Sequence, residues 1–187
     1  LAGEALPPTT VQLALDRIPA ARVTNLYGPG ECCIYSTWHV CTREDVDLFT
    51  IPIGLPLPNY SCYVLDEYLC EVPPGSLGTL YIGGPGVYLG YLNRPDLTEK
   101  AVIESHPKFG RLYNSGDLAK FRPTDGRLLY FGRADFQVKI RGQRLEIGEV
   151  ESAIRNYEQC TGVLVMKRED GSEPYLAAYV TRDPAAA

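Results

Sequence analysis

Glycine and proline interrupt this sequence at short intervals along almost its whole length. Together they make up about 18% of the 187 residues, against roughly 12% in an average protein, and they follow no repeating period. Because both residue types break long helices, their distribution favours many short strands and turns. Hydrophobic residues account for 45% of the chain and charged residues for 22%, so a packed core is expected and bulk disorder is excluded.

The uncharged stretch from Val72 to Asn93 raises the question of a membrane helix. Three prolines and six glycines lie within it, and they would break the internal hydrogen bonds that a helix in lipid requires. No membrane helix is therefore expected.

The charge and the cysteines limit the possible partners. The net charge of −5 argues against a general attraction to nucleic acid or to an anionic membrane. The six cysteines form no C-x-x-C pair and only two histidines are present, which disfavours a structural zinc site and indicates reduced thiols in a cytoplasmic protein. The chain begins without Met or a secretory leader, and we expect it to be an excerpt from a longer polypeptide.

The local patterns predict two parts. The first holds a helix behind a Thr cap at 9–17, a strand at 23–27, and short β runs at 51–55, 60–66, 78–83 and 87–92. Asp125-Gly126 predicts a hairpin between 118–121 and 128–131. The later residues predict a strand at 136–140 and strands at 163–166 and 175–180. Ile147, Val150 and Ile154, at spacings of three and four, predict one apolar face of a helix ending near Tyr157. We expect an α+β protein with a β-rich, barrel-like unit at 1–134 and a small, incomplete α+β unit at 135–187.

Four loops carry residue types suited to chemistry, and each has a simpler structural alternative. Glu31 follows the Gly28-Pro29-Gly30 turn and could hold a divalent metal, or could be a solvated acid beside a turn. Gly83 to Gly86 could approach a phosphate, but without the Lys of a P-loop a tight turn is favoured. Asp117 could accept both hydroxyls of a ribose, or could cap a turn. Arg133 and Asp135 mark a junction that is either a solvated edge strand or a mobile joint facing an anionic ligand.

Taken together, these segments resemble the adenylation domains of nonribosomal peptide synthetases, within the adenylate-forming superfamily. NLYGPGE (25–31) is similar to the motif Asn-x-Tyr-Gly-Pro-Thr-Glu, and YNSGDL (113–118) to Tyr-x-Thr-Gly-Asp-Leu. LYIGGPGVYLGYLNRPDLT (80–98) and GRADFQVKIRGQRLEIGEVE (132–151) resemble two further blocks of the family, in the same order. The resemblance implies an enzyme that activates an amino acid as its aminoacyl-adenylate with ATP and Mg²⁺. It also implies delivery to the phosphopantetheine of a carrier domain, beside a condensation domain of the same synthetase.

The matching positions give residues their expected roles. The resemblance implies that Tyr27 stacks on adenine, that Glu31 ligates Mg²⁺ and that Asp117 holds the ribose. The nucleotide site would further include Gly28, Gly30, Tyr130 and Arg133. Asp135 would be the hinge between the large and small subdomains, and the amino-acid pocket would include Ala2, Leu26, Ile34 and Tyr35.

Departures from the family pattern leave alternatives. Gly30 stands where the family has a Thr whose hydroxyl lies near the α-phosphate. The Lys-bearing phosphate loop, the aromatic-Asp segment that grips the amino group, and the C-terminal Asn-Gly-Lys motif, which holds the catalytic Lys, are not among these residues. We therefore expect residues 1–187 alone to be inactive and to bind Mg-ATP more weakly than about 100 μM. The alternatives to an amino-acid-activating parent are an acyl-CoA ligase and a silent adenylation domain kept as a scaffold.

Overall fold

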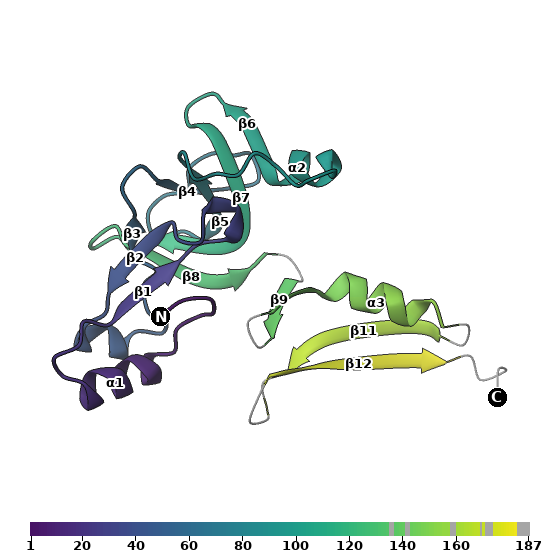
Figure 1. The fold of residues 1–187 in the computed structure, drawn as a ribbon, viewed down its shortest axis with the longest axis horizontal. Coiled ribbons are helices and arrows are strands. Elements are labelled where there is room, and N and C mark those ends of the chain that lie inside the picture. The colour runs from purple at the N-terminus through teal and green to yellow at the C-terminus, as the bar shows by residue number, and fades with distance from the viewer. Residues whose placement is uncertain (135–136, 141–142, 158–159, 169, 171–173, 183–187) are drawn as a thin grey trace. The chain divides into compact units, whose positions relative to one another are not determined.

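The computed structural model describes residues 1–134, 137–140, 143–157, 160–168, 170 and 174–182 (Figure 1). The chain divides into two compact units, Leu1–Ala134 and Asp135–Ala187. The fold is mixed α+β with a curled, barrel-like sheet and few helices, as the sequence predicts. Within the described ranges, no helix has the length and apolar character needed to cross a membrane.

The main sheet of the first unit is antiparallel and is organised around one long strand. Its strands are β4 (Ser61–Leu65), β5 (Gly78–Gly83), β6 (Val102–His106), β7 (Gly110–Phe121) and β8 (Leu128–Arg133). β7 pairs with β5 along one edge, and β6 and β8 pair with opposite ends of its other edge. Bulges at 79/81 and 117/119 interrupt the registers, and bulges bend and twist a sheet locally. This fits the curvature of β7 in Figure 1.

Apolar side chains cover both faces of this sheet. Val64, Leu80 and Ile82 lie in the larger cluster, whereas Tyr81 and Leu112 lie in a smaller one. Leu80 and Ile82 therefore lie on one face and Tyr81 lies on the other, because successive side chains of a strand point to opposite faces of the sheet. Helix α2 (Pro95–Ala101) precedes β6.

A smaller sheet and a helix complete the first unit. β1 (Thr24–Tyr27), β2 (Thr37–Val40) and β3 (Leu55–Pro56) are antiparallel neighbours. The 3-10 helices η1 (Gly30–Cys32) and η2 (Arg43–Asp47) flank β2 in the sequence. α1 (Pro8–Arg17) buries Val11 in a cluster with Val23, Cys41 and Ile51.

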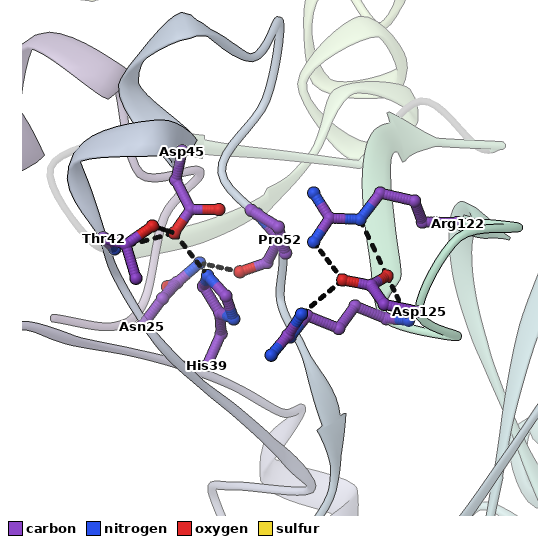
Figure 2. Close-up of polar contacts among 8 residues, drawn as sticks. Asn25, His39, Thr42, Asp45, Pro52, Arg122 and Asp125 are labelled. Atoms are coloured by element: carbon purple, nitrogen blue, oxygen red, sulfur yellow. Dashed lines mark hydrogen bonds and ion pairs between the residues drawn. The ribbon is translucent and has the colours of Figure 1, made fainter.

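Buried polar groups bind the small sheet to its neighbouring loops. The Asn25 side-chain amide donates to the Pro52 carbonyl at 2.9 Å, and the His39 ring Nε2 lies 2.8 Å from the Asp45 carboxylate (Figure 2). Because a buried polar group without a partner is costly, these pairs favour one arrangement of β1, β2 and η2.

The second unit is a small α+β structure. β9 (Gln137–Ile140) and β10 (Gln143–Glu146) form a hairpin, and β11 (Cys160–Arg168) and β12 (Tyr175–Arg182) form another antiparallel pair. α3 (Ile147–Arg155) packs against β11 (Figure 1). Ile147 is buried and Val150 and Ile154 are half-buried, in agreement with the apolar face predicted for this helix, and Val165 of β11 is buried as well.

Four local expectations were wrong. The run expected at 51–55 is a strand only at Leu55, where β3 begins. Residues 87–92 form no strand, because the Arg111 guanidinium occupies the carbonyls of residues 87, 88 and 89 at 3.4, 2.7 and 3.2 Å. α1 has no Thr cap, since Pro7 is its N-cap residue and no side chain caps it. Asp117 lies inside β7 and not in a turn before a strand.

Candidate functional site

Asp117 is a buried carboxylate in the middle of a strand. Gly116 adopts a φ of +70° next to it, a conformation that favours glycine. The amide of Asp117 donates to Ser115 Oγ at 3.1 Å, and that hydroxyl donates to the Leu80 carbonyl at 2.7 Å. Ser115 thus fixes the backbone that presents Asp117.

Two side chains from other elements donate to the Asp117 carboxylate. Arg133 faces Asp117 in the β7–β8 register, and its Nη1 lies 3.2 Å from Oδ1. The Tyr27 hydroxyl, at the end of β1, donates to Oδ2. Asp117 therefore does not cap a turn, and its carboxylate forms a buried polar cluster with Tyr27 and Arg133.

Tyr27 also meets the ring of Tyr130. The two ring centroids are 6.2 Å apart with an interplanar angle of 42°. Burial and the neighbouring Asp117 carboxylate raise the pKa of Tyr27 well above its usual value, so the phenol stays protonated and remains a donor. The structure therefore brings Tyr27, Asp117, Tyr130 and Arg133 together.

The loop after Tyr27 folds back tightly on itself. The Ser36 amide donates to the Tyr27 carbonyl at 2.8 Å. A Cβ on Gly28 would lie 2.6 Å from the Ile34 carbonyl oxygen, so only glycine fits there, whereas a Cβ on Gly30 would meet no atom within 4 Å. Ile34 has a φ of +76°, which is strained for a β-branched residue.

Glu31 is buried in η1, contrary to the alternative of a solvated acid. Glu31 as a whole residue is only 8% exposed to solvent. The Tyr91 hydroxyl donates to Oε1 at 2.7 Å, and the Tyr88 amide donates to the Glu31 carbonyl at 2.8 Å. Burial and the hydrogen bond to Glu31 raise the pKa of Tyr91. Sequence reasoning gave Tyr91 no role, although it lies in the block 80–98 that resembles the family, because its partner Glu31 is 60 positions away.

The residues predicted to line an amino-acid pocket lie around β1 and the loop after it. The Leu26 amide donates to the Leu1 carbonyl at 2.9 Å, which brings the segment containing Ala2 beside β1. Ile34 and Tyr35 are 63% and 38% exposed. Leu26 pairs with Trp38 across β1 and β2, and Trp38 is a partly exposed aromatic that the sequence did not single out.

Two other predicted features have different outcomes. The Gly84–Gly86 loop packs on the turn before β4, because a Cβ on Gly84 would lie 2.4 Å from the Asn59 carbonyl oxygen and one on Gly86 would lie 1.7 Å from Tyr60 Oη. The turn alternative therefore explains these glycines. Asp135, the predicted hinge, lies outside the described residues.

The donor set fits a magnesium nucleotide. Mg²⁺ prefers oxygen ligands and is commonly bound through one or two carboxylates together with substrate phosphates. The buried carboxylate of Glu31 is a suitable protein ligand of this kind. A ribose diol would share the Asp117 carboxylate with Tyr27 and Arg133, and a carboxylate has about four acceptor positions.

Comparisons with known proteins point the same way. The family model described as "AMP-binding enzyme" matches residues 1–92. Malpinin synthetase of Mortierella alpina is 44% identical over 188 residues, which cover 97% of this chain and 2% of that protein.

Two solved structures share the fold. PA1221, described as an NRPS protein containing adenylation and PCP domains, is 30% identical with a TM-score of 0.87, over 100% of this chain and 38% of that one. The Vibrio cholerae adenylation domain AlmE, in complex with glycyl-adenosine-5'-phosphate, is 30% identical with a TM-score of 0.83, over 99% of this chain and 36% of that one. This chain thus spans little more than a third of these solved chains. Its first 92 residues match the AMP-binding enzyme family, and nearly its whole length is similar to part of nonribosomal peptide synthetases and of their adenylation-domain structures.

Proposed function

We propose that the parent enzyme uses ATP to activate an amino acid as its aminoacyl-adenylate and loads it on a carrier domain of the same synthetase. The cluster of Tyr27, Asp117 and Arg133 carries this proposal, because a buried carboxylate beside two aromatic rings suits a ribose and its base. The adenylate bound in AlmE and the PCP domain of PA1221 support the same chemistry. A condensation domain is the further partner expected in such a synthetase.

The nucleotide would be held by residues of the first unit. Tyr27 and Tyr130 offer ring faces to adenine, Asp117 accepts from the ribose hydroxyls, and Arg133 supports Asp117. Gly28 and Gly30 let the loop lie close to the nucleotide. Glu31 would ligate Mg²⁺, which when bound neutralises phosphate charge.

The reaction joins two transfers. A substrate carboxylate oxygen attacks the α-phosphorus of ATP, and the bond to pyrophosphate breaks. The phosphopantetheine thiol of the carrier domain then attacks the acyl carbon, and AMP leaves. Catalysis of this type rests on positioning and charge neutralisation. The two units correspond in this proposal to the end of the large subdomain and the start of the small one, with Asp135 as their hinge.

Part of the amino-acid pocket would lie at the exposed face of β1. Ala2, Leu26, Ile34 and Tyr35 are its proposed lining from this chain. Three of these side chains are apolar and the fourth, that of Tyr35, is uncharged. This part of the pocket therefore favours an uncharged substrate side chain.

Amino-acid-dependent exchange of pyrophosphate into ATP by the full-length parent tests this proposal. Asp117→Ala should reduce kcat/KM for ATP by tenfold or more, since a buried charged acceptor is lost. Asp47→Ala, an exposed position in η2, is the matched control and should change little. Absence of exchange with every amino acid would refute the proposal, and a signal that depends on a fatty acid would favour an acyl-CoA ligase.

A silent scaffold is the second candidate, and Gly30 is the observation that favours it. The position has room for the family's Thr, yet the chain lacks that hydroxyl. A full-length parent that binds no Mg-ATP in titration calorimetry would support the scaffold. For residues 1–187 alone we expect no adenylation and a dissociation constant weaker than about 100 μM, because several charge-assisted hydrogen bonds to phosphate are missing.

A further inference from the structure

Glu31 is held at both its backbone and its side chain by one distant segment. The Tyr88 amide donates to the Glu31 carbonyl at 2.8 Å, and the Tyr91 hydroxyl donates to Oε1 at 2.7 Å. A short 3-10 helix such as η1 has few internal hydrogen bonds of its own. The direction of the Glu31 side chain therefore depends on the segment 88–91.

That segment is itself firmly anchored. The Arg111 guanidinium, from β7, holds the carbonyls of residues 87–89 at 2.7 to 3.4 Å. The Tyr91 amide donates to Thr98 Oγ1 at 2.9 Å. The ring of Tyr88 packs edge-on against Tyr91 at 4.9 Å and against Tyr113 at 5.7 Å.

We propose that Tyr91 is a positioning residue for the Glu31 carboxylate and thereby sets the affinity of the enzyme for the metal of its metal–nucleotide substrate. This inference rests on the proposed function. The physical reason is that a carboxylate ligand is oriented by its own hydrogen-bond partners, whose loss typically lowers metal affinity or activity by about 10–100-fold. The phenol fixes Oε1 through a neutral donor, which itself adds no positive charge beside the cation.

Tyr60 supplies a matched comparison. Its hydroxyl donates to the Cys32 carbonyl at 2.8 Å, so it supports the same 3-10 helix one residue away but does not touch the carboxylate of Glu31. Tyr60→Phe and Tyr91→Phe each remove one phenolic hydroxyl that donates to a residue of η1. A purely structural role for Tyr91 predicts equal effects of the two substitutions, whereas a positioning role predicts different ones.

The experiment measures Mn²⁺ binding to the full-length parent in the presence of saturating ATP, by electron paramagnetic resonance, together with the Mg²⁺ dependence of pyrophosphate exchange. Tyr91→Phe should weaken Mn²⁺ binding by about tenfold or more and raise the Mg²⁺ concentration for half-maximal exchange in parallel. Tyr60→Phe should leave both within about twofold. In a Glu31→Gln background, Tyr91→Phe should have no further effect on Mn²⁺ binding.

The outcomes separate this inference from the function on which it rests. A wild-type parent without amino-acid-dependent exchange would overturn the proposed function. An active wild type in which Tyr91→Phe and Tyr60→Phe bind Mn²⁺ equally well, or are weakened equally, would overturn the positioning role alone. A loss that persists in the Glu31→Gln background would overturn it as well, since Tyr91 would then act independently of Glu31.

Discussion

Replacing Asp45 by alanine should destabilise the junction between the small sheet and η2. One oxygen of this carboxylate, Oδ2, accepts from the Thr42 amide at 2.8 Å and from Thr42 Oγ1 at 3.1 Å, and it lies 2.8 Å from His39 Nε2 (Figure 2). The His39 and Asp45 side chains are 4% and 6% exposed. Alanine removes the acceptor from all three groups at once.

Two losses set the magnitude of the effect. Asp45 is the N3 residue of a capping box with Thr42, and losing a cap costs about 1 kcal/mol. Leaving a buried donor such as the His39 ring unsatisfied costs about 1–3 kcal/mol. We therefore expect Asp45→Ala to lower the free energy of unfolding by about 2–4 kcal/mol.

Equilibrium urea unfolding of the chain can measure this change through Trp38 fluorescence. Trp38 is the single tryptophan, and it precedes His39 in β2. Asp47→Ala, in the same 3-10 helix but exposed, should change the free energy of unfolding by less than about 0.5 kcal/mol. If the two variants unfold within about 0.5 kcal/mol of each other, the reasoning about the buried carboxylate is refuted.

The same carboxylate should make stability depend on pH. Burial opposes ionisation of Asp45, but the hydrogen bonds from Thr42 and His39 outweigh it and lower its pKa. A group with a depressed folded-state pKa contributes stability above its unfolded pKa, about 3.9 for Asp, and loses it as the pH falls through the folded value. The difference between wild type and Asp45→Ala should therefore be largest near neutral pH and shrink below about pH 4.

The glycines supply the remaining predictions. Gly86→Ala should destabilise the chain by about 1–3 kcal/mol, because its Cβ would lie 1.7 Å from Tyr60 Oη. Gly148→Ala, in α3 with open space around it, should instead stabilise the chain by about 0.5–1 kcal/mol. The urea midpoints of the two variants should therefore move in opposite directions. Gly30→Thr should leave stability within about 0.5 kcal/mol and lower KM for ATP in the full-length parent, whereas Gly30→Val should not lower it; equal KM values for the two variants would argue against a hydroxyl contact with phosphate.

The sequence predicted most of the elements because local patterns determine them. The Asp125-Gly126 turn, the apolar face of α3 and the strand before Gly28 depend on residues within a few positions of one another. The missing strand at 87–92 shows the limit of such patterns. Its carbonyls are taken by Arg111 from β7, and no local pattern reveals a side chain that replaces a neighbouring strand.

The site residues followed from motif resemblance, but their partners did not. Tyr27 and Asp117 are 90 positions apart, and Glu31 and Tyr91 are 60 apart. The sequence allowed Glu31 to be a solvated acid and Asp117 to be a turn cap, since nothing local indicates their burial. The pairing of β7 with β8 brings Arg133 to Asp117, and the anchoring of the segment 87–91 brings Tyr91 to Glu31.

The partners of the two acids differ in a way that suits different ligands. Glu31 accepts from the hydroxyl of Tyr91, a neutral donor that fixes an oxygen and itself cancels no charge. Asp117 accepts from the Tyr27 hydroxyl and from the cationic Arg133, which offsets its charge but leaves it an acceptor of hydrogen bonds. A hydroxyl ligand needs an acceptor and no net charge, whereas Mg²⁺ is attracted by the charge itself. The proposed assignment of Glu31 to the metal and of Asp117 to the ribose is therefore compatible with these hydrogen bonds as well as with the two motifs.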